Sequence, residues 1–261
     1  MIPKSIASIN QLSADEKEAI YTRFIPDILL QQFNLQADFI DEEGQSLLTL
    51  RFSEGSTDVV LDLRHEFGAQ DPLLYTHLSD TMNGQIHVLL YIVNDPNSPR
   101  FGVDKMPDGT PTEFGVFRRN IAEEEKALIA GLAPGQVRRG LRLLKHAIPA
   151  FDEFVRALGH DVYFIDPLSY HNAIVFERYG FSYQKGRRFM QRINSGFQPD
   201  GDLFAKLDAS VPFRMPEFYR SIRGRSWAIH DCILGEPYSD VIMYKTINKN
   251  AGINTFPDAE W

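Results

Sequence analysis

The residues best suited to chemistry in this sequence lie between Gly135 and Arg142, where glycine and arginine stand close together. Arg138, Arg139 and Gly140 fall inside this segment. A long helix is predicted to start here, so free backbone N–H groups and a positive partial charge would meet at its first turn. The arginines would add charge-assisted hydrogen bonds. The combination is suited to binding a pyrophosphate, and a solvated helix face with a stray glycine is the alternative.

The helix predicted to begin with this segment has the clearest periodicity in the chain. Apolar residues recur at alternating spacings of four and three: Val137, Leu141, Leu144, Ile148, Phe151, Val155 and Leu158. Such spacing is typical of an amphipathic helix with one buried stripe, which Gly159 would end. The three arginines of the segment would then point away from the core, toward whatever binds at the helix start.

Histidine and aspartate gather in one further stretch, which contains His65, Asp71, His77 and Asp80. These residues lack the His-x-x-x-His spacing with which a helix binds zinc. Cys232 is the one cysteine of the sequence, so a cysteine-based zinc cluster and an intramolecular disulfide are excluded. No metal site is predicted, and a metal-dependent enzyme that uses this stretch remains an alternative.

Composition narrows the class of protein. The chain has 261 residues, 43% of them hydrophobic and 24% charged, which is typical of a soluble globular protein. Residues 1–134 contain 10 lysines and arginines against 21 aspartates and glutamates, so the acidity lies in the first half. An acidic chain of net charge −8 argues against a nucleic-acid partner, because that affinity comes mostly from basic side chains. With no long apolar run and no signal-peptide core, we expect a cytoplasmic protein without a membrane partner.

The first half of the chain predicts a helical start followed by antiparallel strands. Ser13 and Glu16 have capping-box spacing, so a helix is expected over about 13–33, kinked or divided at Pro26. Alternating apolar residues then predict strands at 48–52, 59–63 and 86–92, with short strands at 101–104 and 113–117. A meander would therefore fill residues 46–117.

The second half predicts helices that alternate with strands. A short helix is predicted at 121–131, capped by Asn120, and the long amphipathic helix follows it. After that helix, the pattern indicates a strand at 161–166, a helix at 170–179 and a strand at 181–184. Later, residues 226–234 predict a strand or a helix and 240–247 a strand. This order indicates an α/β (α+β) fold with a mixed, mostly antiparallel sheet and helices on both faces.

The order of elements and two short motifs resemble the GNAT superfamily of acyl-CoA N-acyltransferases. The pyrophosphate loop of that family, Arg/Gln-x-x-Gly-x-Gly/Ala, aligns on Val137–Arg142, and its late segment aligns on Asn172, Ala173 and Phe176–Phe181. The resemblance covers roughly residues 46–184, which we take as the GNAT-like domain. Residues 1–45 would be an N-terminal helical addition, and 185–261 a C-terminal extension packed on the main domain.

The resemblance implies a function and a set of site residues. Acetyl-CoA or another acyl-CoA would be the cosubstrate, its pantetheine along a splayed strand pair, and a small-molecule or peptide amine the acceptor. The residues that the resemblance implies in binding acyl-CoA are Gln136, Val137, Arg138, Arg139, Gly140, Leu141, Arg142 and Asn172. The acceptor amine needs a base, because an ammonium has no lone pair to attack a thioester. Glu113 and His87 are the candidate bases, and Tyr170 is the third candidate catalytic residue.

Departures from the family pattern leave alternatives open. The family favours Arg or Gln where Val137 stands and a small residue where Arg142 stands. Many members of the family have a tyrosine that is proposed to protonate the departing CoA thiolate, and Phe176 occupies its position here. Tyr170 is not a simple substitute for that tyrosine, because it lies six residues before Phe176 on the predicted helix. A helix is also inserted before the loop. A non-catalytic GNAT-like module that binds acyl-CoA or another anion, as a sensor or partner subunit, is therefore the alternative, and a homodimer is left open.

Overall fold

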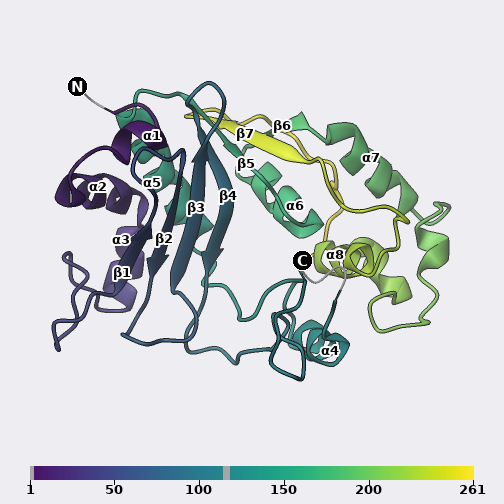
Figure 1. The fold of residues 1–261 in the computed structure, drawn as a ribbon. Coiled ribbons are helices and arrows are strands. Elements are labelled where there is room, and N and C mark those ends of the chain that lie inside the picture. The colour runs from purple at the N-terminus through teal and green to yellow at the C-terminus, as the bar shows by residue number, and fades with distance from the viewer. Residues whose placement is uncertain (1–2, 114–117) are drawn as a thin grey trace. The chain divides into compact units, whose positions relative to one another are not determined.

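The structure is a computed structural model that describes residues 3–113 and 118–261 (Figure 1). Contacts divide the chain into two units, each assembled from three segments. Unit 1 comprises Met1–Asn97, Gly140–Asp166 and Tyr244–Asn250. Unit 2 comprises Ser98–Arg139, Pro167–Met243 and Ala251–Trp261. Each unit is therefore discontinuous in sequence.

Unit 1 contains a run of short N-terminal helices, then strands, then one long helix and a strand. Its elements are α1 (Ile6–Ile9), α2 (Ala14–Tyr21), the 3-10 helix η1 (Thr22–Phe24), α3 (Asp27–Gln32), β1 (Leu48–Arg51), β2 (Asp58–Leu63), β3 (Leu74–Asp80), β4 (Ile86–Val93), α5 (Leu144–Ala157) and β5 (Val162–Ile165).

Unit 2 is mostly helical. Its elements are α4 (Ile121–Ile129), α6 (Tyr170–Arg178), β6 (Ser182–Lys185), α7 (Arg187–Gly196), the 3-10 helices η2 (Phe204–Lys206) and η3 (Pro216–Arg220), and α8 (Ile222–His230). The last strand, β7 (Ile242–Thr246), begins in unit 2 and ends in unit 1.

The strands that the structure describes form a seven-stranded sheet in the order β1-β2-β3-β4-β5-β7-β6. Strands β1 to β4 form an antiparallel meander, in which each strand pairs with the next. Strand β5 then pairs parallel with β4. The predicted α/β class with a mixed, mostly antiparallel sheet is confirmed.

The core of unit 1 lies between one face of the meander and its helices. Figure 1 shows α1, α2 and α3 on one side of the strands. The ring of Phe24, in η1, packs 5.2 Å from the ring of Phe154 in α5, and Phe151 packs 4.9 Å from Tyr163 in β5. These aromatic contacts join the N-terminal helices to α5 and β5 across more than a hundred residues of sequence.

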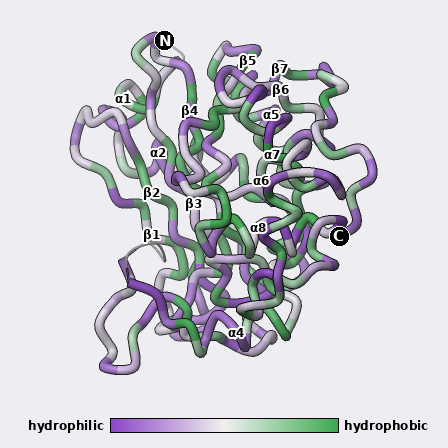
Figure 2. Tube along the Cα trace, turned by 90° about the vertical axis from the view of Figure 1, so that its right-hand side faces the viewer, coloured by the Kyte–Doolittle hydropathy of each residue, from purple (hydrophilic) through white to green (hydrophobic). Residues whose placement is uncertain are grey.

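Capping residues set the helix starts as predicted in most cases. Ser13 accepts from the N–H of Glu16, and Pro26 precedes α3, so the predicted N-terminal helix is divided in two. Asn120 accepts from the N–H of Glu123 at the start of α4. Figure 2 shows hydrophilic and hydrophobic colours within α4, whose buried residues are Glu124 and Ala127.

Two predicted elements are wrong. The long helix starts at Leu144 instead of near Gly135, because the backbone before it bonds elsewhere: the carbonyl of Val137 accepts from Phe101 at 2.8 Å, and Gly140 forms a bridge with Asn94. The residues predicted as a strand at 101–104 form a turn instead, closed by a bond from the N–H of Lys105 to the carbonyl of Gly102. Of the strand predicted at 113–117, residues 114–117 lie outside the described residues.

Unit 2 contains a network of charged side chains around the buried Glu124. One carboxylate oxygen of Glu124 lies 2.9 Å from Arg119 Nε, and the other lies 3.0 Å from His230 Nε2. Arg119 also bonds Asp231 at 2.9 Å, and Asp231 bonds Arg214 at 2.8 Å. Burial would raise the pKa of Glu124, but the hydrogen bonds from His230 and Arg119 outweigh it and lower the pKa below its usual value. The network ties α4 to the end of α8.

Candidate functional site

Strands β4 and β5 lie parallel over a short distance only. His87 pairs with Phe164 and Val88 with Ile165, and the N–H of Asp166 donates to the carbonyl of Val88 at 3.1 Å. Strand β4 continues to Val93, whereas β5 ends at Ile165. Residues 89–93 of β4, which we call the free β4 edge, thus have no ladder partner in β5.

A β-bulge stands where the pairing with β5 ends. In the antiparallel ladder between β3 and β4, Leu78 pairs with Val88 and His77 pairs with Leu90, so Leu89 is the extra residue. Bulges bend a strand, redirect its backbone groups and are frequent beside active sites. The redirected backbone groups of Leu89 therefore lie at the start of the free β4 edge, one residue beyond the last pair with β5.

His87 and Asp166 form a pair beside this bulge. His87 Nε2 lies 2.8 Å from Asp166 Oδ1, and the two side chains are 19% and 29% exposed. The buried neighbours Ile86 and Val88 face the core, so His87 lies on the opposite face of the strand. With Nε2 assigned as the donor to the carboxylate, Nδ1 holds the lone pair, and no described residue bonds it. The pair is arranged to accept a proton.

The far end of the free β4 edge meets the start of α5. Asn94 bridges Gly140, where a Cβ atom would lie 3.1 Å from the carbonyl oxygen of Val93, so glycine suits this close approach. Helix α5 begins shortly afterwards at the N-cap Leu143, without a side-chain cap and without an acidic residue in its first turn. Arg142 and Lys145 are exposed on either side of the helix start. Uncapped N–H groups and two cations form a favourable environment for an anion.

Arg142 has a left-handed backbone, with φ at +57°. This conformation costs a non-glycine residue about 1 kcal/mol, and it falls at the motif position where the resembled family uses a small residue. We expect Arg142→Gly to raise the free energy of unfolding by about 0.5–1 kcal/mol. Chemical denaturation measures the change, and Arg142→Ala is the matched control, because it removes the charge and keeps the strain. Equal stability of the two variants would contradict the assignment of strain.

The structure places four of the predicted binding residues, Gln136–Arg139, in unit 2 and outside any helix. Arg138 bonds the carbonyl of Ser98, and Arg139 bonds the carbonyl of Ala130 at 3.2 Å. Gln136 accepts from the N–H of Ala133, and Val137 packs on the apolar core of unit 2. The expectation that these arginines flank a helix N-terminus is therefore wrong, and Gly140, Leu141 and Arg142, in unit 1, lead into the helix instead.

The other candidates from the sequence divide between the units. His87 is in unit 1, whereas Glu113, Tyr170 and Asn172 are in unit 2. Glu113 is exposed and forms a bridge with Arg118. Tyr170 is buried at the start of α6, where burial raises its pKa to about 12, and Asn172 is half-buried in the same helix. A buried phenol of this kind is poorly suited to accept or deliver a proton at neutral pH.

Sequence reasoning missed Asp166 and the bulge at Leu89. The signal for Asp166 was its place as the last residue of the strand predicted at 161–166, at the carboxyl end where side chains of neighbouring parallel strands converge. Among the described residues, no group of three or more His, Cys, Asp or Glu side chains is placed to hold a metal ion. Asp80 instead accepts from the N–H groups of Ile6 and Ala7 at 2.7 and 2.9 Å. In the same described residues, no helix has the length and apolar character needed to cross a membrane.

Comparison with known proteins adds no family: no family model, curated protein or solved structure matches this chain.

Proposed function

We propose that this chain is an acyl-CoA-dependent N-acyltransferase, with acetyl-CoA or another acyl-CoA as the cosubstrate and an amine as the acceptor. The observation that carries the proposal is the free β4 edge. It has the His87–Asp166 pair at one end and the uncapped start of α5 at the other. The resemblance to the GNAT superfamily implies a splayed strand pair, and the part of β4 that continues past the end of β5 would be its counterpart.

The span of β4 from His87 to the end of the free β4 edge supports binding of a CoA arm. A strand rises about 3.3 Å per residue, so the stretch from His87 to Val93 spans roughly 20 Å. This is comparable to an extended pantetheine arm between its pyrophosphate and its thioester. The amides of that arm would bond to the unpaired backbone groups of β4. The pyrophosphate would then accept from the first N–H groups of α5, with Arg142 and Lys145 beside it.

The transfer follows from the placement of His87. Its Nδ1 takes a proton from the acceptor ammonium, and the freed nitrogen lone pair attacks the thioester carbonyl carbon. The oxyanion that forms is stabilised by backbone N–H groups at the Leu89 bulge. The C–S bond then breaks, and His87 returns its proton to the departing CoA thiolate, which leaves as the thiol. The attacking nitrogen, positively charged after the C–N bond forms, loses its second proton to solvent, so a neutral amide remains on the acceptor. Asp166 holds the imidazole in the required tautomer.

The alternative is a module that binds acyl-CoA without transferring the acyl group. Phe176 favours this alternative, because it has no proton to give where the resembled family has a tyrosine. The proposed route avoids that requirement by returning the proton through His87.

Binding and transfer are tested in sequence on the whole chain. Acetyl-CoA at a hundredfold excess over its Kd is expected to stabilise the folded protein by about 2.7 kcal/mol, seen as a rise in Tm. An amine panel with 13C-labelled acetyl-CoA is then expected to give a labelled amide by mass spectrometry. A Tm rise without a labelled amide favours the sensor alternative. No rise with CoA, acetyl-CoA or longer acyl-CoA contradicts the proposal.

A further inference from the structure

A recess lies in unit 1 at the end of the strands opposite His87. It is formed by the connection from α3 to β1 together with His65, which follows β2. The strand register places Leu48 beside Leu63 at this end, whereas His87 pairs with Ser79 at the other end. The recess has a volume of about 450 Å³, within the range of small-molecule sites. Strand β3 lies between β2 and β4 in the sheet, and the recess shares no residue with the proposed acyl site.

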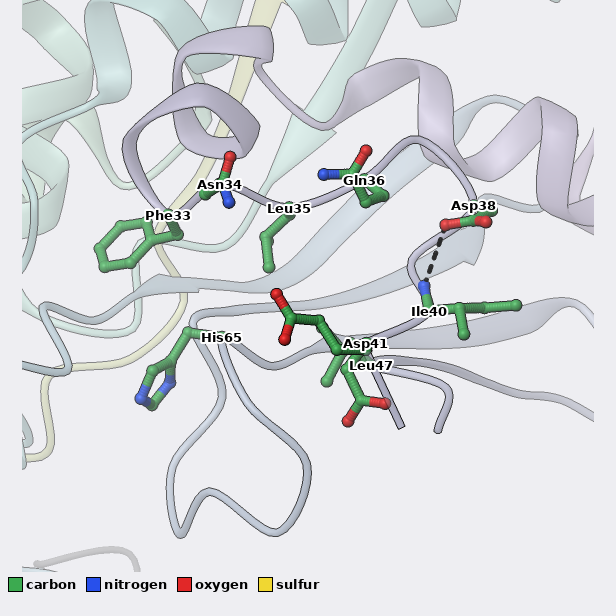
Figure 3. Close-up of a pocket in the computed structure, with 10 residues that line it drawn as sticks. Phe33, Asn34, Leu35, Gln36, Asp38, Ile40, Asp41, Leu47 and His65 are labelled. Carbon is green, nitrogen blue, oxygen red and sulfur yellow. Dashed lines mark hydrogen bonds between the residues drawn. The ribbon is translucent and has the colours of Figure 1, made fainter. Parts of the chain in front are cut away.

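The wall of the recess combines apolar, aromatic and acidic side chains (Figure 3). The rings of Phe33 and His65 stand edge to face, 6.4 Å apart. The aliphatic part of the wall consists of Leu35, Ile40 and Leu47, and the acidic part of Asp38, Asp41 and Glu42. All ten lining residues are described by the structure, and none of them is a lysine or an arginine. The wall therefore offers negative charge to a ligand without a basic side chain to neutralise it.

The three carboxylates differ in what they already bind. Asp38 accepts from the N–H of Ile40, and Asp41 accepts from the N–H groups of Glu43 and Gln45 at 3.1 and 2.7 Å. These two residues hold the connecting loop in shape. Glu42 has no hydrogen bond or ion pair with any described residue, so its carboxylate is free to bind a ligand.

An imidazole nitrogen in the wall also lacks a partner. His65 Nδ1 is buried and bonds no atom among the described residues. Buried polar atoms in folded proteins are nearly always bonded to protein, ordered water or a ligand. The unpaired atom belongs to a residue of the recess wall and is independent of the carboxylates.

We propose that the recess binds an organic cation with an alkylammonium group on an aliphatic chain. The methylene groups pack on Leu35, Ile40 and Leu47, and the ammonium lies against the Phe33 ring and the Glu42 carboxylate. A simple metal ion would leave the apolar wall unused, and a neutral alkyl chain would leave the carboxylates unpaired. A free polyamine and the lysine side chain of a peptide share this chemistry.

Calorimetric titration of the whole chain tests the site with spermidine as the polyamine and Nα-acetyl-lysinamide as the lysine side chain. We expect spermidine to bind with a measurable Kd at physiological salt, and the ratio of the two Kd values identifies the source. Glu42→Gln is expected to weaken the favoured probe by about threefold to fivefold. The matched control is Glu43→Gln, which removes the same charge from the same loop outside the wall, and its Kd should change less than twofold.

A second variant tests whether binding needs the space inside the recess, and it leaves the charge of the wall unchanged. Leu35→Trp keeps every carboxylate and places a larger ring in the recess wall, so we expect it to obstruct the recess and weaken binding, with an unchanged Tm as the check on folding. Equal weakening by Glu42→Gln and Glu43→Gln would reveal diffuse attraction to an acidic surface and overturn the proposal. Absence of heat with both probes up to millimolar concentration would overturn it as well. Neither result depends on acyl-CoA binding at the free β4 edge.

Discussion

Replacing His87 by glutamine is expected to lower the kcat of acyl transfer by about two to four orders of magnitude. Glutamine retains a hydrogen-bonding side chain toward Asp166 but has no group that accepts a proton from an ammonium. The acyl-CoA contacts proposed along β4 are backbone contacts, so the Kd of acetyl-CoA should change less than twofold. Steady-state kinetics with the acceptor found in the amine panel, combined with calorimetric titration of acetyl-CoA, measures both quantities.

Two further variants separate the base from its surroundings. His77→Gln is the matched control, because His77 lies on the neighbouring strand and pairs opposite Leu90 within the same ladder. Its kcat should stay within a factor of three of wild type. Asp166→Asn keeps a hydrogen-bond acceptor and removes the charge that fixes the His87 tautomer, so an intermediate loss of about tenfold is expected. A His87→Gln variant with wild-type kcat would exclude His87 as the base.

Replacing Glu124 by alanine is expected to lower the free energy of unfolding by about 3–5 kcal/mol at pH 7. The reason is the network in unit 2, where removal of the buried carboxylate leaves Arg119 and His230 without their common partner. Urea denaturation followed by tryptophan fluorescence measures the loss, since Trp227 packs 5.6 Å from the His230 ring. Glu125→Ala, one residue along the same helix, is the control. It should lower the free energy of unfolding by less than about 0.5 kcal/mol.

The same carboxylate gives the stability of the protein a defined dependence on pH. The pKa of Glu124 is lower in the folded protein than in the unfolded chain. Its contribution is therefore present above the ordinary glutamate pKa and is lost as the pH falls through the lowered folded value. The stability difference between wild type and Glu124→Gln should thus shrink when the pH is taken from 7 to 3. A difference independent of pH would contradict the lowered pKa.

Local patterns in the sequence predicted much of the fold, because they depend on neighbours in the chain. Ser13 with Glu16 and Asn120 with Glu123 set two helix starts, and alternating apolar residues gave the strands of the meander. Strand β3 was not predicted as a separate strand. Its polar residue Thr76 is fully buried, so its apolar and polar residues do not alternate as in a strand with one buried face. The start of α5 was placed too early, because the apolar spacing continues through Val137 although the backbone bonds there belong to Phe101 and Asn94.

The candidate site was predictable only in part. His87 could be singled out as a histidine within a central strand run, but its partner Asp166 is 79 residues away and requires the parallel register of β4 and β5. The bulge at Leu89 leaves no mark in the sequence, because it depends on how β3 pairs with β4. Arg138 and Arg139 were predicted to bind phosphate from their residue type alone. In the structure, their guanidinium groups donate hydrogen bonds to backbone carbonyls.

Hydrogen–deuterium exchange with and without acetyl-CoA tests most directly whether the free β4 edge binds the cosubstrate. Backbone amides that gain hydrogen bonds from a ligand exchange more slowly, and mass spectrometry of peptides reports where they lie. We expect protection in peptides that cover residues 89–93 and 143–147, with exchange around residues 33–42 unchanged. Acetyl-CoA that protects neither segment, or that protects only segments elsewhere in the chain, would contradict the proposed acyl site.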